Sequence, residues 1–199
     1  MEKRIYLLTG VPGVGKTSVA RRLAERLCAF HIDLSSLILE KNLYSSKDGE
    51  RDTVEVDVEK TRVIVSRLIE SSDRPLIIDG HLASDIVDKK IASLIFVLRI
   101  APWILQIELE RRGYPKSKAK ENIESELIGV CLSDALRVFG PDRVCEIDTT
   151  NKSISMIVDE AFSVIIGERK CSLGIVDWLA SADPEWLRSL NDVHCGELP

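Results

Sequence analysis

Residues 10–18 of the chain read GVPGVGKTS, and this stretch fits the pattern G-x-x-x-x-G-K-[ST]. Its glycines allow backbone N–H groups to turn inward and approach phosphate oxygens closely. In a loop of this kind, Lys16 reaches the β- and γ-phosphates of a nucleotide, and the Thr17 hydroxyl ligates Mg²⁺. The stretch also lies between an expected strand and an expected helix, as such a loop requires. This context favours a nucleotide-binding loop over a simple glycine-rich turn.

Apolar runs and helical periodicities alternate on both sides of this loop. Strands are expected at 3–9, 30–33, 76–79, 93–99 and 143–148. Helices are expected at about 19–27, 34–41, 58–69, 102–111, 117–138 and 153–167, with a polar loop at 45–53. The short continuous apolar runs are typical of parallel strands that are buried on both faces. Strands that alternate with helices predict an α/β fold with a mostly parallel central sheet.

The composition is that of a globular protein, since 45% of the 199 residues are hydrophobic and 30% are charged. It excludes a disordered or collagen-like chain, and the length predicts one domain, at most one and a half. The longest uninterrupted apolar run, 94–98, has five residues, whereas a bilayer-spanning helix needs roughly twenty. The N-terminal sequence lacks a hydrophobic signal segment. We therefore expect a cytoplasmic protein that does not associate with membranes.

Cysteine and histidine positions argue against disulfides and against a structural metal site. The five cysteines are scattered, without a C-x-x-C pair, at positions 28, 131, 145, 171 and 195. This pattern predicts reduced thiols. The three histidines are not spaced like a zinc-binding pair.

Basic residues are concentrated in one segment of an otherwise acidic chain. The formal net charge is −5, yet residues 111–120 (RRGYPKSKAK) hold five basic groups and no acid, which leaves −10 for the remainder. This distribution disfavours direct binding to duplex nucleic acid and favours a small anionic ligand. In phosphoryl transfer, a mobile segment that bears arginine can neutralise the developing charge and exclude water. The alternative for 111–120 is a solvated charge run.

Two polar residues lie at and just after the end of the apolar strand 76–79. Asp79 ends the strand and could hold Mg²⁺ through water, although an Asp-Gly turn is the alternative interpretation. His81 is a candidate catalytic group, and a capping or surface histidine is its alternative. Residue 80 is glycine, so the carboxylate pair with which many ATPases activate water is missing. Guanine recognition is not expected, because Ile154 stands where it needs an aspartate.

Together these segments resemble a known family. They are the loop GVPGVGKTS (10–18), LIIDGH (76–81), LIFVLR (94–99), LERRGY (109–114) and KENIESE (120–126). In this order they are similar to the adenylate-kinase-like NTPases of archaea and eukaryotes that take part in maturation of the small ribosomal subunit. The resemblance covers about residues 4–166, and only the loop is specific by itself.

The resemblance implies a P-loop three-layer fold for residues 1–167, with a small monophosphate-binding segment at 33–56 and a lid at 111–121. It implies a broad nucleoside-monophosphate kinase and ATPase that uses Mg²⁺ with ATP and accepts AMP. A platform ribosomal protein in the pre-ribosome is the implied partner. The implied nucleotide-binding residues are Gly13, Gly15, Lys16, Thr17, Ser18, Arg112 and Lys152. The implied catalytic residues are Lys16, Asp79, His81 and Arg112, with Thr17 and Asp79 at the metal.

One departure from the family concerns the acceptor. Adenylate kinases commonly hold the monophosphate with an arginine in Gly-Asp-Leu-x-Arg, whereas here Leu39 stands at that position. Loss of a bidentate, charge-assisted contact weakens acceptor binding unless Arg51 substitutes. Three hypotheses therefore stay open: a monophosphate kinase, an ATPase assembly factor that switches its binding to a ribosomal partner, and a non-catalytic nucleotide sensor.

Residues 168–199 form a C-terminal extension beyond the nucleotide-binding core. Two short helices are expected, the second with Asp183 as its N-cap and Pro184 at its first position. Their apolar face includes Trp178 and Trp186. This face packs on the protein's own core in one interpretation and binds a partner in the other.

Overall fold

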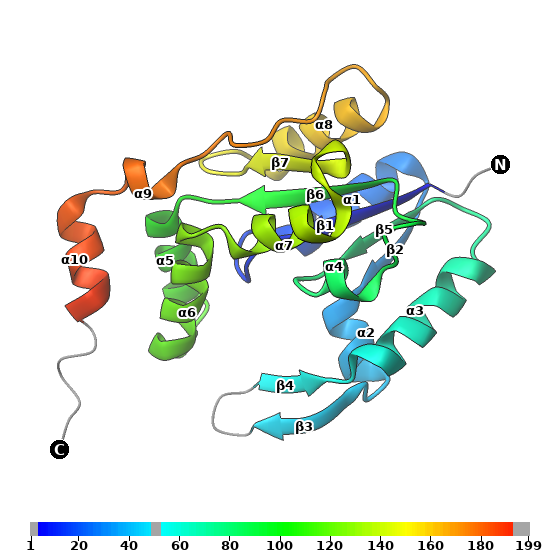
Figure 1. Ribbon diagram of the computed structural model, residues 1–199, viewed down its shortest axis with the longest axis horizontal. Helices are drawn as coiled ribbons and strands as arrows, with labels where there is room; N and C mark the ends of the chain where they lie inside the picture. Colours follow the sequence, from blue (N-terminus) through cyan, green and yellow to red (C-terminus); the bar gives the residue numbers. More distant parts are fainter. Residues whose placement is uncertain (1–3, 49–52, 193–199) are drawn as a thin grey trace.

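A five-stranded parallel sheet forms the centre of the protein (Figure 1), which the computed structural model describes at residues 4–48 and 53–192. The strand order is β2-β5-β1-β6-β7, and each neighbouring pair runs parallel. The strands are β1 (Ile5–Thr9), β2 (Phe30–Asp33), β5 (Leu76–Asp79), β6 (Leu94–Arg99) and β7 (Val144–Asp148). The predicted α/β fold with a mostly parallel sheet is confirmed.

Helices cover both faces of the sheet and enclose two apolar cores. One face carries α1 (Lys16–Leu27), α5 (Pro102–Arg111), α6 (Lys116–Leu127) and α8 (Ile154–Ile165). The other carries α3 (Val58–Ser71), α4 (Ala83–Ile86) and α7 (Val130–Phe139), while α2 (Leu34–Glu40) follows β2. Successive strand residues point to opposite faces, so Leu8 joins the first core and Leu7 the second. Within the described residues, no helix is both long enough and apolar enough to cross a membrane.

The expectation of one long helix over 117–138 is wrong, because the chain breaks between α6 and α7 at Gly129. Gly129 has φ of 70°, a left-handed conformation that glycine adopts readily. Its N–H donates to the Glu126 carbonyl at 3.1 Å and ends α6. The helical periodicity continues on both sides of Gly129, and a single glycine is tolerated within such a pattern. The sequence pattern therefore does not indicate that a helix ends at Gly129.

The expectation of a polar loop at 45–53 is also wrong. The chain forms an antiparallel pair there, β3 (Tyr44–Asp48) with β4 (Thr53–Val56), in which Tyr44 pairs with Val56 and Asp48 with Thr53. This pair stands apart from the central sheet (Figure 1). Because a two-stranded ribbon outside the core needs no buried face, its polar composition is typical of loops.

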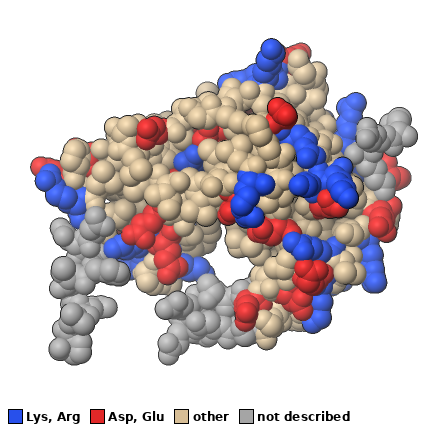
Figure 2. Space-filling model, viewed as in Figure 1, with Lys and Arg blue, Asp and Glu red and all other residues tan. Residues whose placement is uncertain are grey.

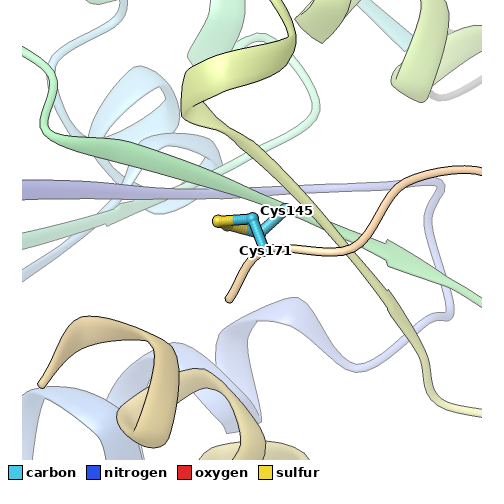
Figure 3. Close-up of a disulfide and its surroundings, with 2 residues drawn as sticks. All are labelled: Cys145 and Cys171. Carbon is cyan, nitrogen blue, oxygen red and sulfur yellow. A yellow bond between two sulfur atoms is a disulfide. The ribbon is translucent and has the colours of Figure 1, made fainter. Parts of the chain in front are cut away.

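Reduced thiols were expected throughout, but Cys145 and Cys171 form a disulfide (Figure 3). Cys145 lies on β7, and Cys171 lies in the segment that follows α8. This segment runs back beside β7, where the Glu146 N–H donates to the Ser172 carbonyl at 2.9 Å. The two Cα atoms are consequently 4.7 Å apart despite 26 residues of separation. Cys28 and Cys131 are free, and Cys195 lies outside the described residues.

A buried charge cluster joins β6, β7 and α6. The Arg99 guanidinium donates from Nε to Glu126 at 2.7 Å and from Nη1 to Glu146 at 2.6 Å. All three residues are at least 96% buried. Burial raises the pKa of Glu126, and its ion pair with Arg99 only partly opposes this effect. The cluster therefore holds two carboxyl groups around one cation.

The C-terminal extension docks on this cluster and on α5. In α9 (Trp178–Ser181), the Trp178 Nε1–H donates to Glu126 at 2.9 Å. The Trp103 ring of α5 makes edge contacts with Trp178 and Trp186, with centroids 5.8 Å and 6.0 Å away. Asp183 caps α10 (Pro184–Asp192) by accepting from the N–H groups of residues 185 and 186. These contacts agree with the intramolecular interpretation of the extension.

We expect Arg99→Met to lower the free energy of unfolding by about 3–5 kcal/mol, because it leaves two buried carboxyl groups without their cation. Urea denaturation measures this loss. Glu126→Gln is the matched control, since its amide oxygen still accepts from Trp178 while one excess acid is removed. The control should lose clearly less stability. Equal losses in both variants would contradict the attribution of the loss to carboxyl groups left without their cation.

Candidate active site

The loop 10–18 connects β1 to α1, and its glycines let it pack tightly against β6 and α5. A Cβ on Gly10 would lie 2.5 Å from the Leu98 carbonyl oxygen, and one on Gly13 would lie 2.9 Å from the Leu105 side chain. Gly15, with φ of 94°, is the N-cap of α1 and supplies no side-chain acceptor to the cap. The loop therefore leads into the amino end of a 12-residue helix, where backbone N–H groups and the helix dipole favour an anion.

This loop lies at the carboxyl end of the sheet, beside a hollow. Figure 2 shows the hollow between the part that carries α5 and α6 and the part that carries α2 and the β3–β4 pair. Ligands of open α/β sheets bind at the carboxyl ends of the strands. A cavity of about 1220 Å³ at the opposite, amino end is lined by residues such as Arg4, Arg74 and Ser93, and by no predicted site residue.

Lys16 begins α1 and lies over the loop. Its Nζ donates to the Val11 carbonyl at 2.9 Å. Burial lowers the pKa of Lys16 to about 8, while the nearby carboxylates of Asp79 and Asp33 act in the opposite direction. The ammonium group thus lies in a poorly solvated position. Within the described residues, it forms no ion pair with a carboxylate.

Asp79 is brought together with Thr17, as the sequence suggested, but also with a residue that the sequence analysis missed. The Thr17 hydroxyl donates to Asp79 Oδ2 at 2.8 Å. His31 Nε2 lies 2.6 Å from Asp79 Oδ1. His31 is in β2, which pairs with β5 only in the folded sheet. No local sequence signal marks it, because strand order is a tertiary property.

His81 follows β5 in the loop toward α4. The Thr9 hydroxyl donates to its carbonyl at 3.4 Å and ties this loop to the end of β1. The residue is exposed at the surface, and partial burial of its imidazole is the main effect that lowers the pKa of His81. The Lys16 and Lys118 ammonium groups lower the pKa further, and Asp85 opposes them. The lowered pKa favours the neutral imidazole, which is able to accept a proton.

The expected lid, 111–121, forms the end of α5, a turn and the start of α6. Gly113, with φ of 70°, makes the turn after Arg112. The Arg112 side chain is 43% exposed, and its Nε lies 3.5 Å from Glu108. Arg111 donates to the same carboxylate at 2.9 Å, and this hydrogen bond lowers the pKa of Glu108. The Arg112 guanidinium is near enough to Lys16 to contribute slightly to the lowered pKa of that lysine.

Lys152 lies in the turn between β7 and α8. Its Nζ donates to Glu160 at 2.8 Å, and Arg169 pairs with the same carboxylate at 3.1 Å. Ile154, two residues later, would be 3.7 Å from a Cβ on Gly15. This turn therefore borders the loop, while the Lys152 ammonium is engaged on α8.

The segment 33–56 contains α2 and the β3–β4 pair. Asp33 caps α2 by accepting from the N–H groups of Ser35 and Ser36. Leu39, at the position where the family carries arginine, is 54% exposed. Arg51 and the side chain of Lys47 lie outside the described residues. No described guanidinium thus stands in this segment to meet an acceptor phosphate.

The donor set at Thr17 and Asp79 fits a magnesium ion. Both groups offer oxygen, which a hard cation prefers. Within the described residues, no group of three or more histidine, cysteine, aspartate or glutamate side chains could form a complete protein cage. Magnesium usually keeps several waters and binds through one or two protein groups together with substrate phosphates. The residues present therefore suit Mg²⁺ that arrives with a nucleotide.

Comparison with solved structures supports the fold. A gluconokinase from Sinorhizobium meliloti covers 94% of this chain with a TM-score of 0.53, at 16% identity and over 98% of its own length. A Deinococcus radiodurans tunicamycin resistance protein covers 86% with a TM-score of 0.57, at 20% identity and over 99% of its length. At such identities the likeness concerns architecture alone.

Sequence comparison is more specific. A family model described as an AAA domain matches residues 7–129. A Methanocaldococcus jannaschii protein named "Putative adenylate kinase" is 37% identical over 86% of this chain and 90% of its own length. A Pyrococcus abyssi protein of the same name is 39% identical over 87% and 91%, respectively. Identity at this level over most of both chains shows common descent, and the chain therefore belongs to the adenylate-kinase-like family of P-loop NTPases.

Proposed function

We propose that the protein transfers the γ-phosphoryl group of ATP to a nucleoside monophosphate, with AMP as the acceptor. The observation that carries this proposal is the contact between Thr17 and Asp79 beside Lys16, at the amino end of α1. A cation, a hydroxyl and a carboxylate in this arrangement match the needs of a bound nucleotide with its metal ion. The relatives named "Putative adenylate kinase" support the same assignment.

Each group at the loop has a defined task in this proposal. The backbone around Gly13 and Gly15, with Ser18 in the first turn of α1, binds the phosphates, and Lys16 neutralises the β- and γ-phosphates. Thr17 and, through water, Asp79 hold Mg²⁺. When bound, this ion neutralises phosphate charge. Because Asp79 is buried at the end of β5, it would fix the position of the metal ion and its bound phosphates relative to the sheet.

The lid and the β7–α8 turn complete the nucleotide site. Arg112 is bound only loosely to Glu108 and is partly exposed, so it can move onto the transferred phosphoryl group. Lys152 would contact the region near the base from the turn beside Gly15. Its ion pair with Glu160 holds that turn in place. Movement of 111–121 over the bound nucleotide would also exclude water.

An ATPase assembly factor is the second candidate, and Leu39 favours it. The exposed leucine supplies no charge-assisted contact to an acceptor phosphate. Water would then be the acceptor, activated by the neutral imidazole of His81. Hydrolysis would switch binding to a platform ribosomal protein of the pre-ribosome, as the family resemblance implies. Kinase activity would be incidental in this case.

Product analysis with and without AMP distinguishes the two candidates. The kinase consumes AMP and forms two ADP from each ATP, whereas the ATPase forms one ADP and one phosphate without AMP. We expect AMP to accelerate ATP consumption, as measured by chromatography of the nucleotides together with a phosphate assay. Phosphate release with no AMP consumption would favour the assembly factor. Near-normal turnover in Lys16→Ala would contradict both candidates.

His81→Ala should slow hydrolysis in the absence of AMP more than transfer to AMP. A neutral imidazole that removes a proton from water typically contributes about 10²- to 10⁴-fold in rate, whereas an acceptor phosphate arrives already ionised. Parallel assays of phosphate release and AMP phosphorylation measure the two effects. Equal losses would instead assign His81 to support of the loop between Asp79 and α4.

ATP binding should weaken as the pH rises above about 8. The pKa of Lys16 is lowered to about 8 in the nucleotide-free protein, so above this pH the lysine must take up a proton to face the phosphates. Up to about a tenfold loss in affinity per pH unit follows. Calorimetry in two buffers of different ionisation enthalpy measures the proton uptake. In Lys16→Arg, which stays charged, the uptake should disappear; uptake equal to that of the wild type would assign it to another group.

A further inference from the structure

His31 is placed against the candidate metal site by the register of the sheet. β2 and β5 are parallel, with His31 opposite Ile77 and Asp33 opposite Asp79. Because strand side chains alternate, His31 and Asp79 point to the same side of the sheet, two register positions apart. An imidazole is long enough to cross this diagonal, and Nε2 reaches Asp79 Oδ1 at 2.6 Å.

Both oxygens of Asp79 are consequently engaged by different elements. Oδ1 meets His31 from β2, and Oδ2 accepts from the Thr17 hydroxyl at the start of α1. The Asp79 side chain is only 2% exposed, whereas that of His31 is 19% exposed. A carboxylate accepts and does not donate, so the contact requires the proton on Nε2 of His31. The carboxylate cannot rotate without breaking one of these two hydrogen bonds.

This restraint matters because the terminal torsion of an aspartate is soft. Its preferred range is broad and roughly two-fold, so a carboxylate held at one oxygen alone can turn. When a nucleotide is bound in the proposed function, Thr17 would contact the metal through an oxygen lone pair, and its proton alone, donated to Oδ2, would leave Asp79 free to turn. The contact from His31 to Oδ1 remains available in that state.

We propose that His31 is a positioning residue that holds the Asp79 carboxylate so that Oδ2 faces the metal ion bound with the nucleotide. This inference rests on the proposed assignment of Thr17 and Asp79 to Mg²⁺. His31 touches neither nucleotide nor acceptor in this scheme and acts only through Asp79. Groups that support metal ligands in this way typically change metal affinity by about 10- to 100-fold when they are removed.

The test compares variants of His31 in the full chain by metal binding rather than by turnover alone. Mn²⁺ stands in for Mg²⁺, and its binding in the presence of a non-hydrolysable ATP analogue is followed by electron paramagnetic resonance. His31→Leu should raise the Kd of Mn²⁺ about tenfold or more. His31→Gln, whose amide nitrogen can take the position of Nε2, should restore binding to within about threefold. The Kd of the analogue measured with EDTA should stay unchanged in both variants.

Phe30→Leu serves as the matched control, because Phe30 is the neighbouring residue in β2 and is 42% exposed. It should change neither metal binding nor nucleotide binding. If His31→Leu does not fold, as judged by its melting transition, His31→Asn replaces it, since the shorter amide keeps polarity but cannot reach Oδ1.

Unchanged Mn²⁺ affinity in a folded His31→Leu or His31→Asn would overturn the inference. So would an equal loss of the metal-free analogue, because it would mean general damage to the loop. The metal measurement requires no phosphoryl transfer, so it is independent of whether AMP is the acceptor. If the wild type binds Mn²⁺ with the analogue but does not phosphorylate AMP, the kinase proposal fails while the role of His31 stands.

Discussion

The buried carboxylate of Asp79 is the constraint around which the candidate site is arranged. A carboxylate with so little contact with solvent must be hydrogen-bonded, and its two oxygens are bound by Thr17 and His31. These contacts join the start of α1 to β5 and β2. The loop 10–18 is therefore held against the sheet by the same group that we assign to the metal ion. Asp79 therefore contributes both to the packing of the loop and to the proposed metal site.

A second buried polar cluster performs a comparable task on the lid side. Arg99 links β6 to Glu126 at the end of α6 and to Glu146 on β7. The extension reinforces this link because Trp178 donates to Glu126. Trp178 also contacts the ring of Trp103 at the start of α5. The helices that flank the lid turn are thus anchored at their far ends, while Arg112 near the turn remains partly exposed. Anchored helix ends with a partly exposed arginine at the turn between them suit the proposed movement of 111–121 over a nucleotide.

Most of the fold and the central part of the site could be predicted from the sequence because their signals are local. The apolar runs 76–78 and 94–98 are short and continuous, and such runs are typical of parallel strands that helices cover on both faces. The loop 10–18 needs glycine at position 10, where a Cβ would collide with the Leu98 carbonyl, and at position 15, where φ is 94°. Its sequence pattern therefore indicates the backbone conformation directly. Thr17 and Asp79 could both be assigned to the metal from the sequence, because each lies where an element defined by periodicity begins or ends.

The remaining features depend on which distant segments meet, and no local pattern encodes this. His31 reaches Asp79 only because β2 lies beside β5, and Cys145 meets Cys171 only because the chain returns along β7. The break at Gly129 also depends on the tertiary structure, because the backbone turns there beside the buried guanidinium of Arg99. Sequence alone thus determined the fold class and the phosphate loop, through short-range periodicity and sterics. The tertiary structure decided the partners of the buried polar groups, because those partners are selected by strand order and packing.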